Sequence, residues 1–373
     1  MLVTGCAVNI DADHYADIDE RVRCETDKKR VPVLARKLVE NASNDRSEAA
    51  FRTCVDTSFK GPSTKDTSNP PIRNAQLSAI RAGGDAAFRT RVDLKIQDGC
   101  NNACAFCIVH TARGPARSMP AREVIEQAQV LAENGVNELV LVGIDLAAYH
   151  DGAFELSDLI EELEAQTDIA RIRISSVEPQ SMTPALIRTL ANSDGRVCRH
   201  LHLCLQSGST KVLAEMNRHY TAQGFEKLVD RLRGEVPNIA LSTDVIVGFP
   251  GETDEDFQES YKLIKRSGFM RLHVFRYSKR PGTPAAARAD QVNAQTKAAR
   301  AKQLIELGDA LALEDMQRRL GTTEQTIIER PGLGTSESYH PVSCNNTLEL
   351  GSLAMLEFTD IDTRRMRLIG KET

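Results

Sequence analysis

No apolar run in this sequence approaches the roughly 18 residues that a membrane-spanning helix requires, so no transmembrane helix is expected. Only five residues precede Cys6 in the opening MLVTGC, which leaves no room for the charged and apolar regions of an export signal. These two absences predict a cytoplasmic protein with no membrane partner.

The sequence has too few cysteines for a disulfide framework. Nine cysteines, an odd number, are too few to stabilise 373 residues by disulfides, and three of the nine fall within the eight residues 100–107. In a reducing compartment, such clustering indicates a metal site.

Positive charge is not in excess. The chain carries 47 Lys and Arg against 52 Asp and Glu, for a net charge of -5. This balance argues against bulk electrostatic attraction to nucleic acid, so RNA binding would require a local basic face. The proportions of hydrophobic residues (41%) and charged residues (27%) are typical of a globular protein, and 373 residues predict two or three domains.

From residue 91 onward, β-rich runs alternate with amphipathic helical stretches, which predicts an α/β fold with a parallel sheet. The expected strands lie within residues 91–99, 137–145, 170–179, 199–209, 238–252 and 268–283. Six such units match an incomplete (β/α)6 barrel, whose functional site is expected at the C-terminal ends of the strands.

The rest of the chain divides by composition. We expect a small α/β unit at 1–60, a linker rich in Ser, Thr, Pro and Gly at 61–90, the barrel at 91–290 and a helical connection at 291–320. Residues 321–373 alternate apolar and polar residues in short runs at 326–329, 338–344, 347–351, 353–362 and 365–371, which predicts a small C-terminal β-barrel.

The segment DGCNNACAFCIVHTARG places Cys100, Cys104 and Cys107 in a CxxxCxxC spacing directly after the first expected strand. Three thiolates can hold three irons of a 4Fe-4S cubane and leave the fourth iron without a protein ligand. The amino and carboxylate groups of S-adenosylmethionine could chelate that open iron. A zinc site is the alternative, but no partner CxxC pair is evident, and a ferredoxin-like carrier would need a fourth cysteine nearby.

This pattern resembles the radical S-adenosylmethionine superfamily, and four blocks narrow the resemblance to its methylthiotransferases: KIQDGCNNACAFCIVHTARG, HLHLCLQSGSTKVLAEMNRHYT, DVIVGFPGET and FRYSKRPGTPAA. The forms MNRHYT and YSKRPGTPAA resemble the branch that modifies threonylcarbamoyladenosine at position 37 of tRNA. The resemblance also implies that residues 321–373 form the RNA-binding β-barrel called TRAM. That barrel would be nearly neutral overall, with basic residues gathered in DTRRMRLIGK.

The resemblance implies which residues bind S-adenosylmethionine at the strand ends. The candidates are polar, acidic, aromatic or glycine residues of the matched blocks and strand ends: Phe106, Gly143, Asp145, Glu178, Gln206, Ser207 and Asp244. For the modified nucleoside or RNA phosphate, the candidates are the guanidinium groups of Arg113, Arg117 and Arg276, since arginine pairs such anions in a bidentate manner. The histidines of the HLHL run, His200 and His202, are expected to be packed imidazoles rather than metal ligands.

The sequence departs from the family near its start. The stretch LVTGCAVN resembles the surroundings of the third cysteine of an N-terminal domain that holds a second cluster, which would make Cys6 an auxiliary-cluster ligand. The two upstream cysteines of that motif are missing, and Cys24 and Cys54 stand in other contexts. The expected N-terminal unit is therefore a remnant of the domain, and a second 4Fe-4S cluster is in doubt.

The resulting expectation is a monomeric tRNA methylthiotransferase that uses S-adenosylmethionine, a 4Fe-4S cluster and an electron donor such as flavodoxin or ferredoxin. Reductive cleavage of S-adenosylmethionine would generate the radical that drives conversion of a C–H bond at C2 of the adenosine into a C–S bond. Two alternatives stay open: methylthiolation of an Asp in a ribosomal protein, and an iron-sulfur or RNA-binding remnant that has lost sulfur transfer.

Overall fold

The computed structural model describes residues 2–3, 23–24 and 91–373, apart from 153 and 194. Leu2–Val3 (β1) and Arg23–Cys24 (β2) form a short parallel pair. The remaining expectations for residues 1–90, including those for Cys6 and Cys54, lie outside the described residues. Within the described part of the chain, no helix is long and apolar enough to cross a membrane.

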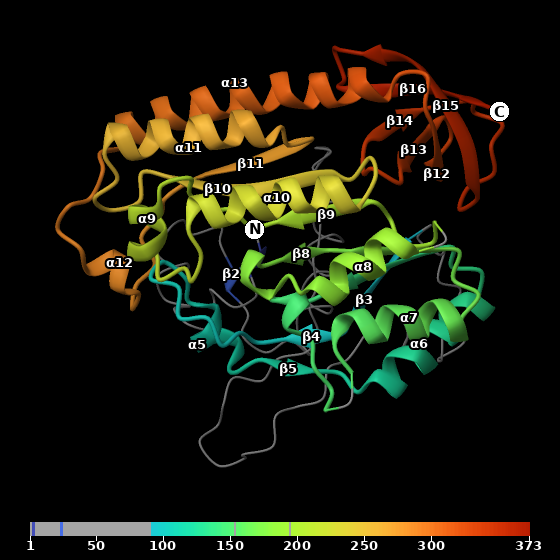
Figure 1. Ribbon diagram of the computed structural model, residues 1–373, viewed down its shortest axis with the longest axis horizontal. Helices are drawn as coiled ribbons and strands as arrows, with labels where there is room; N and C mark the ends of the chain where they lie inside the picture. The colour runs from blue at the N-terminus through green and yellow to red at the C-terminus, as the bar shows by residue number, and fades with distance from the viewer. Residues whose placement is uncertain (1, 4–22, 25–90, 153, 194) are drawn as a thin grey trace.

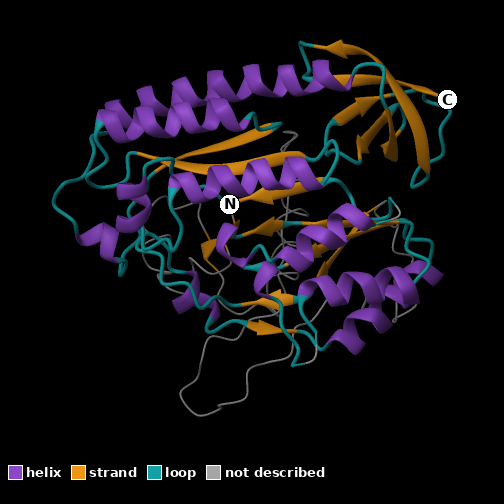
Figure 2. Ribbon diagram, viewed as in Figure 1, coloured by secondary structure: helices purple, strands orange, loops and turns teal. Residues whose placement is uncertain are grey.

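Residues 91–276 form the mixed α/β unit that the sequence predicted (Figure 2). Its parallel strands are β3 (Arg91–Lys95), β6 (Glu138–Val142), β7 (Arg171–Ile174), β8 (Ser176–Val177), β9 (His200–Leu203), β10 (Ala240–Val247) and β11 (Arg271–Arg276). They pair in the orders β3-β6-β7 and β8-β9-β10-β11. A parallel bridge between Ile172 and Val197 links the two sheets, so the strands follow one another in chain order.

Helices follow most of the strands and cover them (Figure 1). They are α6 (Ala121–Glu133), α7 (Leu156–Gln166), α8 (Pro184–Asn192), α9 (Thr210–Glu215), α10 (Ala222–Glu235), α11 (Asp254–Ser267), α12 (Pro284–Ala287) and α13 (Ala294–Arg319), with single 3-10 turns at Leu146–Ala148 and Pro179–Ser181. Local signals fix several ends. The Thr183 side chain accepts a hydrogen bond from Leu186 at the start of α8, and Gly268 ends α11 in the left-handed conformation.

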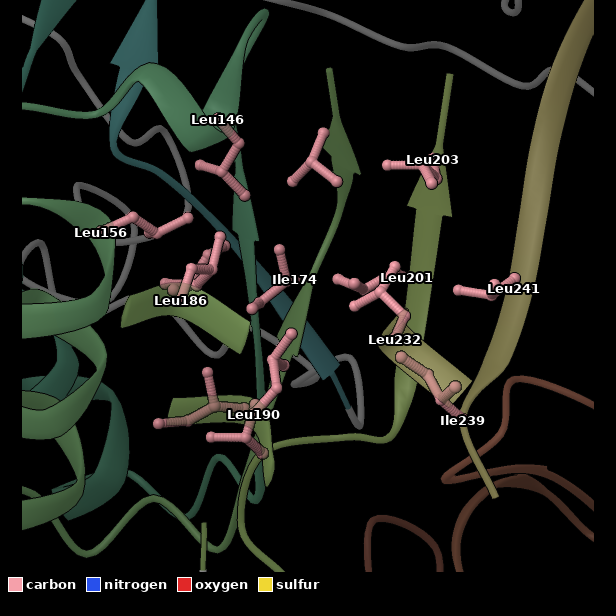
Figure 3. Close-up of a cluster of buried hydrophobic side chains, with 14 of the residues drawn as sticks. Leu146, Leu156, Ile174, Leu186, Leu190, Leu201, Leu203, Leu232, Ile239 and Leu241 are labelled. Atoms are coloured by element: carbon pink, nitrogen blue, oxygen red, sulfur yellow. The ribbon is translucent and has the colours of Figure 1, made fainter. Parts of the chain in front are cut away.

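A continuous apolar core lies between the strands and these helices. In Figure 3, Leu201 of β9 and Leu241 of β10 lie beside Leu232 of α10, while Leu186 and Leu190 of α8 lie on the other side of the cluster with Ile174 of β7. All of these side chains are buried. The helices α9 and α10, which lie between the fourth and fifth expected strands, are not predicted from the sequence.

The C-terminal strands close into a small barrel. They are β12 (Thr323–Arg330), β13 (Leu333–Ser336), β14 (Pro341–Ser343), β15 (Leu353–Asp362) and β16 (Arg367–Glu372), in the order β12-β13-β14-β16-β15. The expectation of a small β-barrel is confirmed. One detail was wrong: residues 347–351 form turns, whereas the unpredicted residues Leu333–Ser336 form a strand.

The β-barrel docks on the N-terminal ends of the parallel strands through a buried ionic cluster. Glu138 accepts hydrogen bonds from both Arg171 and Arg173, and all three side chains are excluded from solvent. The remaining guanidinium donors bond to backbone carbonyls of the barrel, with Arg171 donating to Gln325 at 2.7 Å and Arg173 donating to Ser336 at 3.0 Å. Each buried charge is thereby paired and fully hydrogen-bonded, as burial demands.

Candidate functional site

The three clustered cysteines lie in a loop that leaves and re-enters the α/β unit at one point. The loop connects β4 (Gln97–Asp98) with the short helix α5 (Val109–Arg113) and the strand β5 (Arg117–Ser118). At its neck, the amide of Cys100 donates to the carbonyl of Gly114 at 3.2 Å. Gly99 has φ +71°, and a Cβ there would lie 2.0 Å from the Pro115 carbonyl oxygen. Only glycine suits this position.

Asp98 anchors the neck of the loop by charge. Its buried carboxylate accepts a hydrogen bond from Arg117 at 2.7 Å, and Lys95 and Arg113 lie 3.0 and 3.9 Å from it. Two of the predicted anion-binding arginines, Arg113 and Arg117, therefore form ion pairs with Asp98. The third, Arg276, is exposed at the end of β11.

The three thiols of the loop lie close enough for their charges to interact. Cys104 is buried, whereas Cys100 and Cys107 are partly exposed. Burial, against the opposing charge of Arg218 and together with the charges of Glu178, Cys107 and Cys100, raises the pKa of Cys104 to about 11. Backbone amides of Asn102 and Val109 donate to the sulfurs of Cys100 and Cys107 at 3.3 and 3.4 Å.

This donor set fits a soft metal cluster. Three thiols, free of disulfides, converge from one loop, and two of the sulfurs already accept amide hydrogen bonds of the kind that support iron-sulfur ligands. Burial favours the protonated form of the Cys104 thiol, whose pKa it raises. A bound metal would reverse this preference by pairing with the thiolates.

Carboxylates at the ends of neighbouring strands face the cysteine loop. Asp145 follows β6, and its carboxylate accepts a hydrogen bond from the side chain of Asn102 at 3.0 Å. Gln180 in turn donates to Asn102 at 2.9 Å. Burial, followed by the charge of Glu178, raises the pKa of Asp145. The loop is thus tied to two strand ends, and the two predicted acids lie close together.

Arg218 is a central residue that the sequence argument did not single out, although it stands in the quoted block MNRHYT. Its buried guanidinium donates to Glu178 and lies 5.6 Å from the ring centroid of Phe106. It also lies near Cys104, since its charge opposes the raised pKa of that thiol. Arg218 therefore connects the acid, the aromatic residue and the thiol of the predicted site.

The other predicted strand-end residues support the backbone around the site. Gln206 has φ +64° and bridges β9 and β10, because its amide donates to Asp244 at 2.8 Å and its carbonyl accepts from Ile246. The buried Ser207 hydroxyl shares a hydrogen bond with Ser260. A Cβ on Gly143 would lie 2.9 Å from Gln97 Oε1. That oxygen accepts the amides of residues 144 and 145, so Gly143 lets Gln97 orient Asp145.

A cavity of about 320 Å³ lies between the strands, on the N-terminal side of these residues. His202 on its wall contacts Ser242 through Nδ1 at 3.1 Å and Asp244 through Nε2 at 3.2 Å. His200 is buried and contacts the same serine at 3.1 Å. Both histidines are thus packed and hydrogen-bonded. Tyr339 of the β-barrel also lines this cavity, a long-range contact that no local sequence signal predicts.

A family model and several known proteins match this chain. Residues 94–264 match the Radical SAM superfamily. The chain is 47% identical over 229 residues to threonylcarbamoyladenosine tRNA methylthiotransferase MtaB of Bacillus subtilis (strain 168), covering 61% of this chain and 51% of that protein. It is 32% identical over 330 residues to the protein of the same name from Chlamydia pneumoniae, covering 88% of this chain and 70% of that protein.

A third relative bears a different substrate in its name. The tRNA-2-methylthio-N(6)-dimethylallyladenosine synthase of Methylacidiphilum infernorum (isolate V4) is 39% identical over 358 residues, covering 88% of this chain and 76% of that protein. Among solved structures, the radical SAM enzyme coproporphyrinogen III oxidase (HemN) from Escherichia coli aligns with a TM-score of 0.48 at 18% identity, covering 76% of this chain and 69% of that one. Against several of the relatives, the chain spans about half of their length.

Proposed function

This chain belongs to the radical S-adenosylmethionine methylthiotransferase family, and on that basis we propose that it methylthiolates C2 of threonylcarbamoyladenosine at position 37 of tRNA. The observation that carries the proposal is the convergence of three free thiols beside Asp145 and Glu178 at the strand ends. The names of two relatives, 47% and 32% identical, support the choice of nucleoside.

Cys100, Cys104 and Cys107 would hold a 4Fe-4S cluster with one iron left open for S-adenosylmethionine. Such a cluster, when reduced, supplies the electron that breaks a carbon-sulfur bond of S-adenosylmethionine. The chain's own residues bind and orient that molecule: the carboxylates of Asp145 and Glu178 suit its ammonium and ribose hydroxyl groups. Asn102 keeps Asp145 at a fixed distance from the thiols.

Arg218 has two roles in this proposal. It holds Glu178 in place through a hydrogen bond. Its charge also lies near Cys104 and would stabilise the thiolate form of that residue as a cluster ligand. The ring of Phe106, 5.6 Å from the guanidinium carbon, would limit the access of water to the same region. Gly143, Gln206, Ser207 and Asp244 complete the proposed binding region mainly through backbone geometry.

The tRNA would be held by surfaces outside the thiol loop. The β-barrel of residues 321–373 is proposed to be the TRAM domain, with Arg364, Arg365, Arg367 and Lys371 as its phosphate-binding patch. Arg276, exposed on β11, is a further candidate for the RNA backbone. The division of residues 91–290, 291–320 and 321–373 into an incomplete barrel, a helical connection and TRAM belongs to the same proposal, as do a cytoplasmic location, a monomeric state and a flavodoxin or ferredoxin donor.

Mass spectrometry of tRNA nucleosides tests the function. A strain that lacks the gene is complemented with the wild-type protein, with Cys104→Ser, or with Cys344→Ser, which removes a partly buried thiol of the β-barrel as a matched control. We expect 2-methylthio-threonylcarbamoyladenosine with the wild type and Cys344→Ser, and its loss with Cys104→Ser. Unchanged 2-methylthio levels in the deletion strain would sink the proposal, and loss of a methylthiolated ribosomal Asp instead would favour the protein-modifying alternative.

A further inference from the structure

We propose that Arg271, at the base of the cavity between the strands, binds the carboxylate of the nucleoside's threonyl group and so selects a carboxylate-bearing substituent over an apolar one. This inference rests on the proposed function and deepens it. It addresses a choice that the relatives leave open, because their names include both a threonylcarbamoyl and a dimethylallyl nucleoside.

The cavity extends along one face of β11 to Tyr339 of the β-barrel. Arg271, His273 and Phe275 alternate along the strand, and all three line the cavity. In the register with β10, Phe275 lies opposite Ile246, which packs against the apolar cluster containing Phe106 of the cysteine loop. Arg271 lies four residues earlier, about 13 Å along the strand at roughly 3.3 Å per residue. Phe275 therefore marks the end near the loop, and Arg271 marks the base.

The charges around the base leave Arg271 uncompensated. Arg173 is paired with Glu138 at 2.8 Å, and Arg91 is paired with Glu329 at 3.2 Å. Among the residues that the structure describes, no carboxylate forms an ion pair with Arg271. Its guanidinium lies instead over the ring of Tyr339, 5.3 Å from the centroid. The guanidinium of Arg271 is half-buried and has no acid beside it, so a ligand carboxylate would neutralise a charge that is costly to remove from water.

Tyr339 holds this arrangement in place. Its ring is surrounded by three guanidinium groups, with Arg173 at 4.7 Å and Arg91 at 5.6 Å in addition to Arg271. It also stacks on His200 at 4.7 Å between centroids. Its backbone φ of +69° is uncommon for a non-glycine residue, which indicates that the surrounding contacts hold it. Tyr339 of the β-barrel thus forms the base of the cavity and positions the guanidinium group of Arg271.

The two candidate substituents differ in how they would interact with Arg271. A threonylcarbamoyl group ends in a carboxylate, which an arginine binds through two parallel hydrogen bonds. A dimethylallyl group is apolar, so it would bury the Arg271 charge without a partner. A cavity of about 320 Å³ is at the small end of ligand sites, as expected for the adenine base with its side arm rather than for a whole nucleotide.

The test compares anticodon stem-loop RNAs that differ in one group. The first carries threonylcarbamoyladenosine, the second carries its threonine carboxamide, and the third carries dimethylallyladenosine. Binding of each fluorescently labelled RNA is measured by anisotropy with reconstituted protein in the absence of reductant, so no turnover occurs. Methylthiolation rates are measured separately after reduction. Wild type is compared with Arg271→Gln, Arg271→Lys and Arg231→Gln, the last a control on an exposed α10 arginine that pairs with Glu235.

We expect wild type and Arg231→Gln to lose about 30-fold or more in affinity when the carboxylate becomes a carboxamide. Arg271→Gln should bind the two RNAs equally, and Arg271→Lys should retain partial discrimination because it keeps the charge without the fork. Equal discrimination by wild type and Arg271→Gln, no discrimination by wild type, or tighter binding of the dimethylallyl RNA would overturn the inference. Failure of the proposed function looks different, because no stem-loop is then methylthiolated whatever the binding data show. Thermal unfolding of each variant verifies that it is folded.

Discussion

The side-chain amide of Asn102 donates a hydrogen bond of 3.0 Å to the carboxylate of Asp145, which joins the cysteine loop to the end of β6. The backbone amide of the same residue donates to the Cys100 sulfur at 3.3 Å. One asparagine therefore fixes the spacing between a cluster ligand and a carboxylate proposed to bind S-adenosylmethionine.

Replacing Asn102 with Ala should uncouple cluster binding from S-adenosylmethionine cleavage. Iron and sulfide content should match the wild type, because the three thiols remain, whereas 5′-deoxyadenosine formation should fall about tenfold through loss of one hydrogen bond to a charged group. Asn134→Ala is the control, since Asn134 is exposed and its side chain donates only to Val130 of its own helix. A wild-type rate for Asn102→Ala would contradict the proposed role.

Gly99→Ala should prevent the loop from closing. The new Cβ would overlap the Pro115 carbonyl, a backbone atom that cannot swing away, and φ of +71° adds conformational strain. We expect substoichiometric iron after reconstitution. Gly234→Ala serves as the comparison, because that helical glycine has open space around its Cβ position and alanine favours helix. Full iron content in Gly99→Ala would show that the neck tolerates rearrangement.

Glu138→Ala should lower the free energy of unfolding by about 3–5 kcal/mol, because Arg171 and Arg173 would stay buried without their shared carboxylate. Urea titration followed by circular dichroism measures the change. Glu126→Ala, which breaks an exposed pair with Arg122, should cost at most about 0.5 kcal/mol. Similar losses in the two variants would mean that the buried cluster contributes no more than a surface pair.

Acid should loosen the contact between α13 and the β-barrel in two stages. Burial lowers the pKa of His340, despite its 2.8 Å contact with Asp315, so the folded protein resists the proton that the unfolded chain accepts. Stability from this histidine is present above its ordinary pKa and declines as pH falls below it. Burial opposes ionisation of Asp315, but His340 and Arg319 hold its pKa below the ordinary value, so its contribution is lost at lower pH.

His340→Gln should therefore flatten the decline in thermal midpoint between pH 7.5 and 5.5, roughly the interval around an ordinary histidine pKa. His150→Gln, at an exposed position, should leave the wild-type slope intact. Parallel slopes in His340→Gln and wild type would assign the acid sensitivity to other buried histidines such as His200, whose pKa burial also lowers.

The sequence predicted most of what depends on local periodicity. Six strands, the helices α6, α7, α8, α11 and α13, and the alternating strands of the β-barrel follow from apolar spacing and from end signals such as Thr183 and Gly135. The helices α9 and α10 and the strand β13 were missed. The strand β13 has only four residues, one of which is Gly334. It is therefore too short to show a recognisable alternation of apolar and polar residues.

The sequence by itself determined the chemistry of the cysteine loop, because three thiols within eight residues are close whatever the rest of the chain does. It also placed Asp145 and Glu178 at strand ends, since parallel strands bring their ends to one edge. Only the tertiary structure decided what surrounds them. Arg218 meets Glu178 across 40 residues of sequence, and Tyr339 reaches Arg271 from another domain, 68 positions away. Such pairings depend on how distant surfaces dock, and no periodicity within either segment records the partner.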